Sequence, residues 1–390
     1  MTAEQMLLID ALRAAMTGGS CALNTDVDWS SFLRLASSHS LLPLVCDGIR
    51  KVPDAWEKTP KNVQAHLSSA YKQAIYQDTQ RDYTKQQLTD RLTEARIPHI
   101  FLRGSVLKYD YPEPALRTMT DLDILVYAKD FKEIAKIAQS LGAETIEGDG
   151  NHRNYGFPGN VLVEFHPNLL HHATAVGTGI NPGWQYAKKD CPGYAMELTE
   201  EGFYLNTICH IAEHFVNGGI GVRFVLDIWV SRHLRKQRIN RDFIEAELTR
   251  LGLLDFAQKL EQLSDTWFGG LPMTPLMEEL GLYILTSGSH GMKNRATLNS
   301  LSLSSGGSRF SALWKKAFYP KAELEDRFPW CKGRSLLLPA AWCARAYNAV
   351  TKHGDIILKW SKDTGKISKE QVAENRKKLK RFGIDGNKES

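Results

Sequence analysis

Segments that favour β-strands are confined to one stretch of the chain, residues 97–166, and sequence with helical periodicity flanks that stretch on both sides. The β-prone runs are residues 97–102, 121–126, 153–157 and 161–166. Between the second and third of these runs, residues 130–141 have the apolar spacing of an amphipathic helix. We therefore expect an α+β protein, in which a small mixed β-sheet core is flanked by N-terminal and C-terminal helical regions.

This pattern divides the chain into four regions. We expect an N-terminal helical region at 1–95, the sheet core at 96–198, a C-terminal helical region at 199–358 and a polar basic tail at 359–390. A length of 390 residues suits two or three packed units of roughly 150 residues each. Within the C-terminal region, residues 287–310 are rich in Ser, Gly and Asn, which predicts a loop.

Composition excludes several classes of protein. Hydrophobic residues make up 43% of the chain and charged residues 24%, which is ordinary for a globular protein and unlike a disordered or collagen-like chain. The 6 cysteines include no CxxC pair, so we expect free thiols in a reducing compartment and no structural zinc. A net charge of +5 does not by itself indicate nucleic-acid binding. The N-terminus lacks the basic segment of a signal peptide, and no apolar run is long enough to span a membrane. We therefore expect a cytoplasmic protein without a membrane partner.

The first candidate site is a turn that follows the strand predicted at 97–102. Gly104 and Ser105 come directly after Arg103 and open a short helical segment. The first N–H groups of a helix have no intrahelical acceptor and the helix dipole is positive at this end, so the turn suits a phosphate group. The pattern is common by itself, and its meaning depends on the residues that follow.

Two aspartates on the next predicted strand form the second candidate site. Asp121 and Asp123 are two residues apart on a strand, so both side chains point from the same face. Carboxylates this close repel each other, and a divalent cation is the usual partner that stabilises both as anions. Mg²⁺ favours oxygen ligands and shares its coordination with substrate phosphates. Glu164 is the candidate for a third carboxylate on a neighbouring strand, and His166 shares its face.

The alternative for Asp121 and Asp123 is a solvated acidic pair on a surface strand. A third interpretation is a structural ion pair, and the three differ in the effect of a substitution. A surface acidic pair predicts no difference between the wild type and the variants in stabilisation by Mg²⁺ and nucleotide. If both carboxylates are unneutralised in the metal-free protein, replacing either with asparagine should leave the stability unchanged or slightly raised, because repulsion is relieved. A structural ion pair predicts a loss of stability.

The segment from Phe101 to Val126, FLRGSVLKYDYPEPALRTMTDLDILV, resembles the nucleotidyltransferase superfamily with a DNA polymerase β-like palm. The signature of that superfamily is Gly-Ser before a helix, then Asp-x-Asp on a strand, then a third carboxylate. Over roughly residues 25–235 the sequence more narrowly resembles the uncharacterised nucleotidyltransferase family. The residues that carry this resemblance are Arg103-Gly104, Tyr111-Pro112, Arg117, the strand at 121–126, Glu164-Phe165-His166, His210, His214, Arg223 and Asp227. Arg103 stands where that family usually has lysine, and Glu164 where it more often has aspartate.

The resemblance implies an enzyme that binds a nucleoside triphosphate with Mg²⁺ or Mn²⁺, transfers the nucleoside monophosphate to an acceptor and releases pyrophosphate. Residues 96–198 would form the nucleotidyltransferase core. Asp121, Asp123 and Glu164 would be the catalytic, metal-binding set, and Glu164 could also accept the proton of an attacking hydroxyl. The residues expected to contact the nucleotide are Gly104, Ser105, Arg103, Arg117, His166 and Arg223. The resemblance names no acceptor, which could be a small molecule, a protein or an RNA.

Several alternatives compete with parts of this interpretation. His210-Ile-Ala-Glu-His214 matches the H-x-x-E-H pattern, in which two histidines share one helical face and could bind Zn²⁺. Arg223 and Asp227 are four residues apart on a predicted helix and could simply pair with each other. The chain could also be a degenerate nucleotide-binding module that senses without turnover, although all three carboxylates are present. A toxin-like nucleotidyltransferase acting on tRNA is favoured only by the basic tail.

Overall fold

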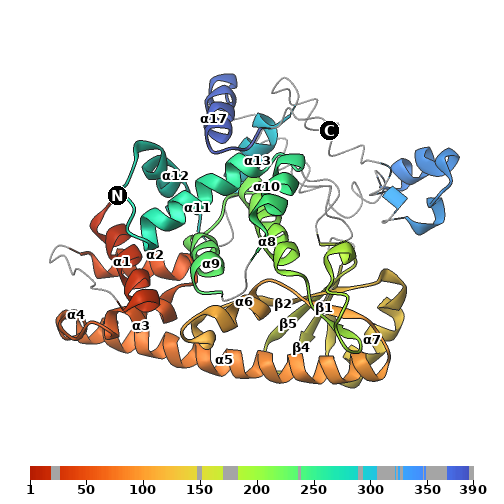
Figure 1. Ribbon diagram of the computed structural model, residues 1–390, viewed down its shortest axis with the longest axis horizontal. Helices are drawn as coiled ribbons and strands as arrows, with labels where there is room; N and C mark the ends of the chain where they lie inside the picture. Colours follow the sequence, from red (N-terminus) through yellow and green to blue (C-terminus); the bar gives the residue numbers. More distant parts are fainter. Residues whose placement is uncertain are drawn as a thin grey trace.

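The computed structural model describes residues 1–18, 27–146, 152–169, 183–235, 239–288, 293–304, 321, 324–325, 328–345, 347 and 367–385. A six-stranded mixed sheet is flanked by helical regions toward both ends of the chain (Figure 1). This arrangement confirms the α+β fold expected from the sequence.

The sheet contains every strand that the sequence predicted and two short ones that it did not. The strands are β1 (His99–Phe101), β2 (Asp121–Val126), β3 (Glu144–Ile146), β4 (Arg153–Phe157), β5 (Val161–His166) and β6 (Ala195–Met196). Their order is β3-β4-β5-β2-β1-β6. The β2–β5 and β1–β6 pairs are parallel, and the other pairs are antiparallel. Strands β3 and β6 have only 3 and 2 residues, too few to show an alternating pattern in the sequence.

The helices are concentrated before and after the sheet. The N-terminal helices are α1 (Ala3–Thr17), α2 (Trp29–Ser38), α3 (Leu42–Arg50), α4 (Pro53–Lys58) and α5 (Lys61–Glu94). The sheet region contains α6 (Gly104–Leu107) and α7 (Phe131–Ser140). The C-terminal helices include α8 (Glu200–Val216), α9 (Val222–His233), α10 (Arg241–Arg250), α11 (Leu254–Phe268), α12 (Pro275–Leu285), α13 (Lys293–Ser302) and α17 (Lys369–Arg381).

Helix α5 connects the N-terminal helices to the sheet. It has 34 residues, which corresponds to a length of about 50 Å. In Figure 1 it runs along one side of the molecule, beneath the N-terminal helices and the sheet. Near its C-terminal end, Leu88 and Leu92 pack with α7 and with Leu122 and Ile124 of β2 in one hydrophobic cluster. The opposite face of the sheet is thereby left to polar side chains and to the C-terminal helices.

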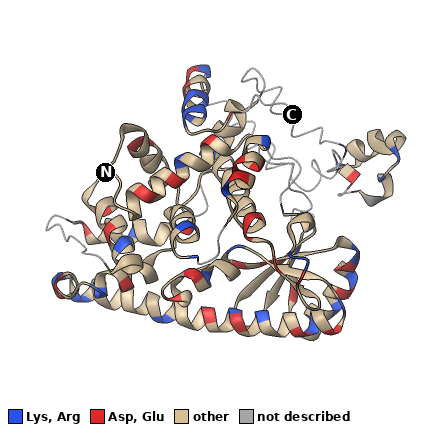
Figure 2. Cartoon of the chain, in the orientation of Figure 1, with Lys and Arg blue, Asp and Glu red and all other residues tan. Residues whose placement is uncertain are grey.

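Residues 293–302 form helix α13, so the loop predicted for 287–310 is wrong for this part of the segment. The helix is held by tertiary contacts. The side-chain amide of Asn299 donates to the carbonyl oxygens of Phe215 and Val216, and Asn375 of α17 donates to Asn299. Figure 2 shows basic residues gathered on α17, whose buried side packs against α13. Partners far away in the sequence therefore override a composition that is typical of loops.

The turn that carries Gly104 and Ser105 is anchored to α5. Nζ of Lys108 lies 2.8 Å from Oδ1 of Asp78 and 2.5 Å from Oδ1 of Asp82. Lys85 donates to the carbonyl oxygen of Ser105 at 3.0 Å. Because Lys108 is buried, its positive charge requires these carboxylates. The pairing fixes the C-terminal end of α6 relative to the long helix.

We predict that Lys108→Met lowers the free energy of unfolding by about 3 kcal/mol, because the buried carboxylate of Asp78 loses its cation. Urea unfolding measures the change. Lys136→Met is the control, since Lys136 forms an exposed ion pair with Glu133 and its loss should cost less than about 0.5 kcal/mol. Equal losses in the two variants would contradict the anchoring role of Lys108.

Candidate functional site

Two neighbouring parallel strands build an acidic face on the sheet. In the register of β2 and β5, Asp123 lies opposite Glu164. Asp121 and Asp123 share the face of β2 that points away from the α5–α7 cluster, because side chains alternate along a strand. The same alternation on β5 leaves Glu164 and His166 half-buried between fully buried apolar residues. The structure thus places these four predicted site residues on one face.

Asp123 is the most heavily contacted member of this group. Its Oδ2 lies 2.9 Å from Nη1 of Arg103, and its Oδ1 lies 2.7 Å from Nε2 of His166. The same histidine nitrogen lies 3.5 Å from Oε2 of Glu164. One ligand atom each from Asp123, Glu164 and His166 all lie within 4.8 Å of one another. No other group of three such ligands is this close among the residues that the structure describes.

The pKa values of the carboxylates on this face are shifted in different directions. Burial, followed by repulsion from Asp123 and Glu164, raises the pKa of Asp121 to about 6. Burial also raises the pKa of Glu164. Asp123 is buried as well, but Arg103 and His166 overcome that effect and hold its pKa well below the usual range. Asp123 therefore has direct partners in Arg103 and His166, whereas Asp121 forms no ion pair with any residue that the structure describes.

This difference corrects one expectation from the sequence. The spacing of Asp121 and Asp123 alone predicts an equivalent pair of unneutralised carboxylates. The structure supports that description for Asp121, whereas Asp123 is already paired with Arg103 and hydrogen-bonded by His166. The reason is tertiary, because Arg103 and His166 reach Asp123 from β-sheet neighbours that are distant in the sequence. The two substitutions should consequently have opposite effects on stability.

The Gly104–Ser105 turn begins at a strained residue. Arg103 has φ 50° and ψ −116°, a conformation that non-glycine residues seldom adopt and that is often found at functional sites. Ser105 is buried, and its hydroxyl donates to the carbonyl oxygen of Leu102 at 3.0 Å. A Cβ atom at Gly104 would lie 2.2 Å from Nη1 of Arg117. The glycine is thus required by Arg117, a constraint that the sequence did not reveal.

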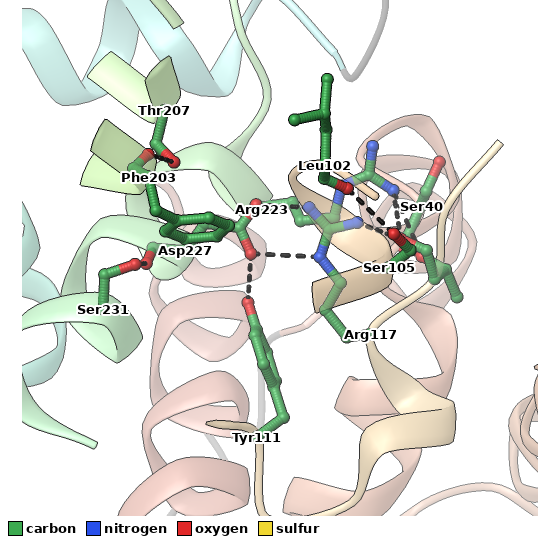
Figure 3. Close-up of polar contacts among 11 residues, drawn as sticks. Ser40, Leu102, Ser105, Tyr111, Arg117, Phe203, Thr207, Arg223, Asp227 and Ser231 are labelled. Carbon is green, nitrogen blue, oxygen red and sulfur yellow. Dashed lines mark hydrogen bonds and ion pairs between the residues drawn. The ribbon is translucent and has the colours of Figure 1, made fainter. Parts of the chain in front are cut away.

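Arg117 is held by a buried carboxylate of α9. Its Nη2 lies 2.6 Å from Oδ2 of Asp227, and its Nε donates to Oδ1 of the same residue at 3.2 Å. The hydroxyl of Tyr111 donates to that Oδ1 at 2.7 Å, as Figure 3 shows. All three side chains are buried. This contact joins the segment before β2 to the C-terminal helices.

Arg223 does not form the pair with Asp227 that the sequence spacing allowed. Its Nη1 instead donates to the carbonyl oxygen of Thr118 at 2.8 Å. The Thr118 hydroxyl in turn donates to the carbonyl oxygen of Ser40, between α2 and α3. Thr118, just before β2, therefore connects α9 to the segment between the N-terminal helices α2 and α3.

The H-x-x-E-H segment lies on α8. The ring centroids of His210 and His214 are 4.3 Å apart. Burial, then the charges of Arg103 and His214, lower the pKa of His210 well below its usual value. Burial raises the pKa of Glu213, with Arg103 and His166 opposing. These partners place the segment beside the acidic face.

Comparison with known proteins identifies the family. Residues 25–269 match the model of the uncharacterised nucleotidyltransferase family. The chain belongs to this family. The match covers the acidic face, the Gly104–Ser105 turn, α8 and α9. No curated protein and no solved structure matches the chain. None of the described helices is both long and apolar enough to cross a membrane.

Sequence reasoning did not find two features of the described structure. The first is the Tyr111–Arg117–Asp227 contact, for which the resemblance supplied the residues but not their pairing. The second is Arg81 of α5, whose pKa is lowered by burial and is affected by the charges of Asp121 and Arg117. No local pattern distinguishes Arg81 from the other charged residues of α5, so only the packing of the helix could find it.

We predict that Gly104→Ala destabilises the protein by about 1–3 kcal/mol, the cost of overpacking, because the added methyl group displaces Arg117 from Asp227. Thermal and urea unfolding measure the change. Gly156→Ala is the matched control, since a Cβ there would meet only the end of the Ile146 side chain at 3.3 Å. A loss in Gly104→Ala no larger than in the control would show that Arg117 moves away without cost.

We predict opposite signs for Asp121→Asn and Asp123→Asn in metal-free buffer at pH 7. The first should preserve or raise the stability. The second should lower it by on the order of 3 kcal/mol, because Arg103 loses its partner.

The pH dependence of Asp121 has a definite sign. Its pKa of about 6 in the folded protein exceeds the value of about 3.9 in an unfolded chain. Ionisation is therefore more costly in the folded state, and this residue reduces stability as the pH rises from about 4 to about 6. Urea unfolding across this range should show a smaller fall for Asp121→Asn than for the wild type. Parallel curves would contradict the unneutralised state of Asp121.

Proposed function

We propose that this protein is a metal-dependent nucleotidyltransferase, which transfers a nucleoside monophosphate from a nucleoside triphosphate to an acceptor and releases pyrophosphate. The observation that carries the proposal is the acidic face, where Asp121, Asp123 and Glu164 lie beside the Gly104–Ser105 turn. Family membership supports the same reaction class. Burial raises the pKa values of Asp121 and Glu164, and carboxylates perturbed in this way are typical of functional sites.

The donor set fits a divalent cation. Asp121 lacks a cationic partner among the described residues, and Asp123, Glu164 and His166 already present ligand atoms within 4.8 Å of one another. The carboxylates suit Mg²⁺, and the imidazole of His166 makes Mn²⁺ an equally suitable ion. When bound, such an ion would neutralise the negative charge that gathers on the reacting phosphate.

The proposed reaction assigns a role to each carboxylate. Asp121 and Asp123 hold the metal, and Glu164 completes its binding site. An oxygen of the acceptor forms a bond to the α-phosphorus, the bond from that phosphorus to the β-bridging oxygen breaks, and pyrophosphate leaves with the electron pair. Where the acceptor is a hydroxyl, Glu164 takes its proton, a role that suits a carboxylate whose pKa burial has raised.

Binding of the triphosphate would use the turn before α6. The first N–H groups of that turn have no intrahelical acceptor, and Arg103 stands at its start. In the present structure Arg103 neutralises Asp123. It is placed to exchange this pairing for contact with a phosphate oxygen when Asp123 is otherwise neutralised. The buried hydroxyl of Ser105 bonds to Leu102, so the backbone of Ser105 is the better candidate for the phosphate contact.

Pyrophosphate release tests the proposal. The purified protein should release pyrophosphate from one or more of ATP, CTP, GTP and UTP with Mg²⁺ or Mn²⁺, either alone or after addition of desalted cell extract as the acceptor source. Asp121→Asn and Asp123→Asn should lose at least about 100-fold of this activity, the scale on which single catalytic groups act. Glu133→Gln, on the exposed side of α7, should keep it.

The outcomes distinguish the competing functions. A melting-temperature increase with a nucleoside triphosphate, but no pyrophosphate release with any extract, would favour a sensing module without turnover. Absence of both effects for all four nucleotides and both metals would contradict the proposal.

A further inference from the structure

The polar face of the sheet extends past the candidate carboxylates onto β4. In the antiparallel register of β4 and β5, Asn154 lies opposite Glu164, which in turn lies opposite Asp123 of β2. His152 comes just before β4, and its ring centroid is 5.4 Å from that of His166. Because side chains alternate along a strand, His152 and Asn154 share the face of the carboxylates. Neither residue has a part in the chemistry proposed above.

The side chain of Asn154 is incompletely hydrogen-bonded. It is half-buried, and its buried Oδ1 has no hydrogen-bond partner in the described part of the chain. Tyr155 and Phe157 of the same strand belong to the hydrophobic cluster on the opposite face, so Asn154 is not part of that core. A carbonyl oxygen that is buried without a donor is costly. An amide can turn about its terminal bond and present either its oxygen or its NH₂ group, so a bound substrate can supply the missing hydrogen bond.

The two ends of this face are covered to different extents. At the β1 end, Ile100, Leu102 and Leu125 share the face and are buried in the main hydrophobic cluster, together with residues of α8 and α9. At the other end, the strand beyond β4 is β3, and all of its residues are exposed. The β4 side is therefore the less covered approach to the carboxylates.

The geometry of the proposed reaction also assigns this side to the acceptor. In a phosphoryl transfer, the attacking and leaving oxygens lie roughly in line, on opposite sides of the phosphorus. The Gly104–Ser105 turn, which would hold the departing phosphates, follows β1. In the sheet, β2 and β5 with their carboxylates lie between β1 and β4. An acceptor opposite the turn would consequently lie over β4, next to Glu164.

We propose that Asn154 and His152 form the acceptor subsite, and that the acceptor is a small alcohol with neighbouring hydroxyl groups, such as a sugar or a polyol. This inference rests on the proposed nucleotidyltransferase function. The oxygen of one hydroxyl bonds to the α-phosphorus, its proton passes to Glu164 and pyrophosphate leaves. The next hydroxyl pairs with Asn154, and a further one with His152.

The spacing and chemistry of these side chains suit such an acceptor. Residues directly opposite each other in an antiparallel pair have Cβ atoms about 5 Å apart, so Glu164 and Asn154 can contact two adjacent hydroxyl groups of one molecule. A hydroxyl group both donates and accepts, and it therefore pairs with either end of an amide. It is also small enough to reach a half-buried side chain.

Surrogate acceptors test the subsite. Glycerol and 1,2-propanediol carry neighbouring hydroxyl groups, whereas 1-propanol carries only one. At equal concentrations of acceptor, with a nucleoside triphosphate and Mg²⁺ or Mn²⁺, the wild type should form the nucleotidyl ester at least about 10-fold faster with either polyol than with 1-propanol. The reason is that a site built to bind a hydroxyl group discriminates strongly against an analogue that lacks it. Pyrophosphate release gives the rate, and mass spectrometry identifies the ester.

Two variants assign the preference to β4. Asn154→Leu keeps nearly the same volume but cannot hydrogen-bond, so it should slow transfer to the polyols at least about 10-fold and leave transfer to 1-propanol and the KM for the triphosphate unchanged. His152→Phe should slow transfer to glycerol by about 5-fold, the scale of one hydrogen bond. Thr145→Val is the control, since Thr145 is an exposed residue of β3 that lies opposite Tyr155, on the other face.

Thermal unfolding separates substrate binding from a structural role. Asn154→Leu should keep or raise the ligand-free melting temperature, because it removes an incompletely bonded polar group. A lower melting temperature together with a raised KM for the triphosphate would show a structural role and overturn the proposal. Equal rates with the polyols and 1-propanol in the wild type would also overturn it, as would an unchanged preference in Asn154→Leu.

The remaining outcomes distinguish this inference from the function on which it rests. Pyrophosphate release with cell extract but with neither polyol, including transfer only to the RNA or protein of the extract, would overturn the assigned acceptor class and leave the nucleotidyltransferase reaction standing. Absence of pyrophosphate release under every condition would overturn the reaction itself, and the acceptor subsite with it.

Discussion

The buried contact between Arg117 and Asp227 is the interaction on which the rest of the site depends. It joins the segment that leads into β2 to helix α9, and so connects the acidic strand to the C-terminal helices. The Arg117 guanidinium also occupies the space above Gly104, which explains the glycine there. Because both charges are buried, loss of either partner leaves the other uncompensated, at a cost of about 3–5 kcal/mol.

Two charged side chains near this contact, Asp121 and Arg223, form no ion pair with a described residue. Asp121 forms no ion pair with a described residue, and its pKa is raised to about 6. Arg223 has no anion, and its pKa is lowered to about 10. These groups do not neutralise each other by direct contact.

The sequence predicted the central strands well because their patterns are local. Residues 121–126, 153–157 and 161–166 form strands with the expected bounds, since alternation and turn residues mark them clearly. The loop predicted from the sequence is wrong at residues 293–302, where the hydrogen bond between Asn299 and the distant Asn375 stabilises a helix. The candidate carboxylates were found by their spacing. The burial of Arg81 was not found, because nothing in a long polar helix distinguishes it from the other charged residues.

The sequence by itself determined that Asp121 and Asp123 share a face, because side chains alternate along any strand. It also determined that a glycine begins α6 and that two histidines of α8 lie on one helical side. Only the tertiary structure decided which charges are paired. Arg103 and His166 reach Asp123 but leave Asp121 alone, and Asp227 pairs with Arg117 while its neighbour on α9, Arg223, is left without a counter-ion. The physical reason is that a buried charge interacts most strongly with the groups that lie within a few ångströms of it. The packing of the chain decides which groups these are, and neither the spacing of residues nor the composition specifies them.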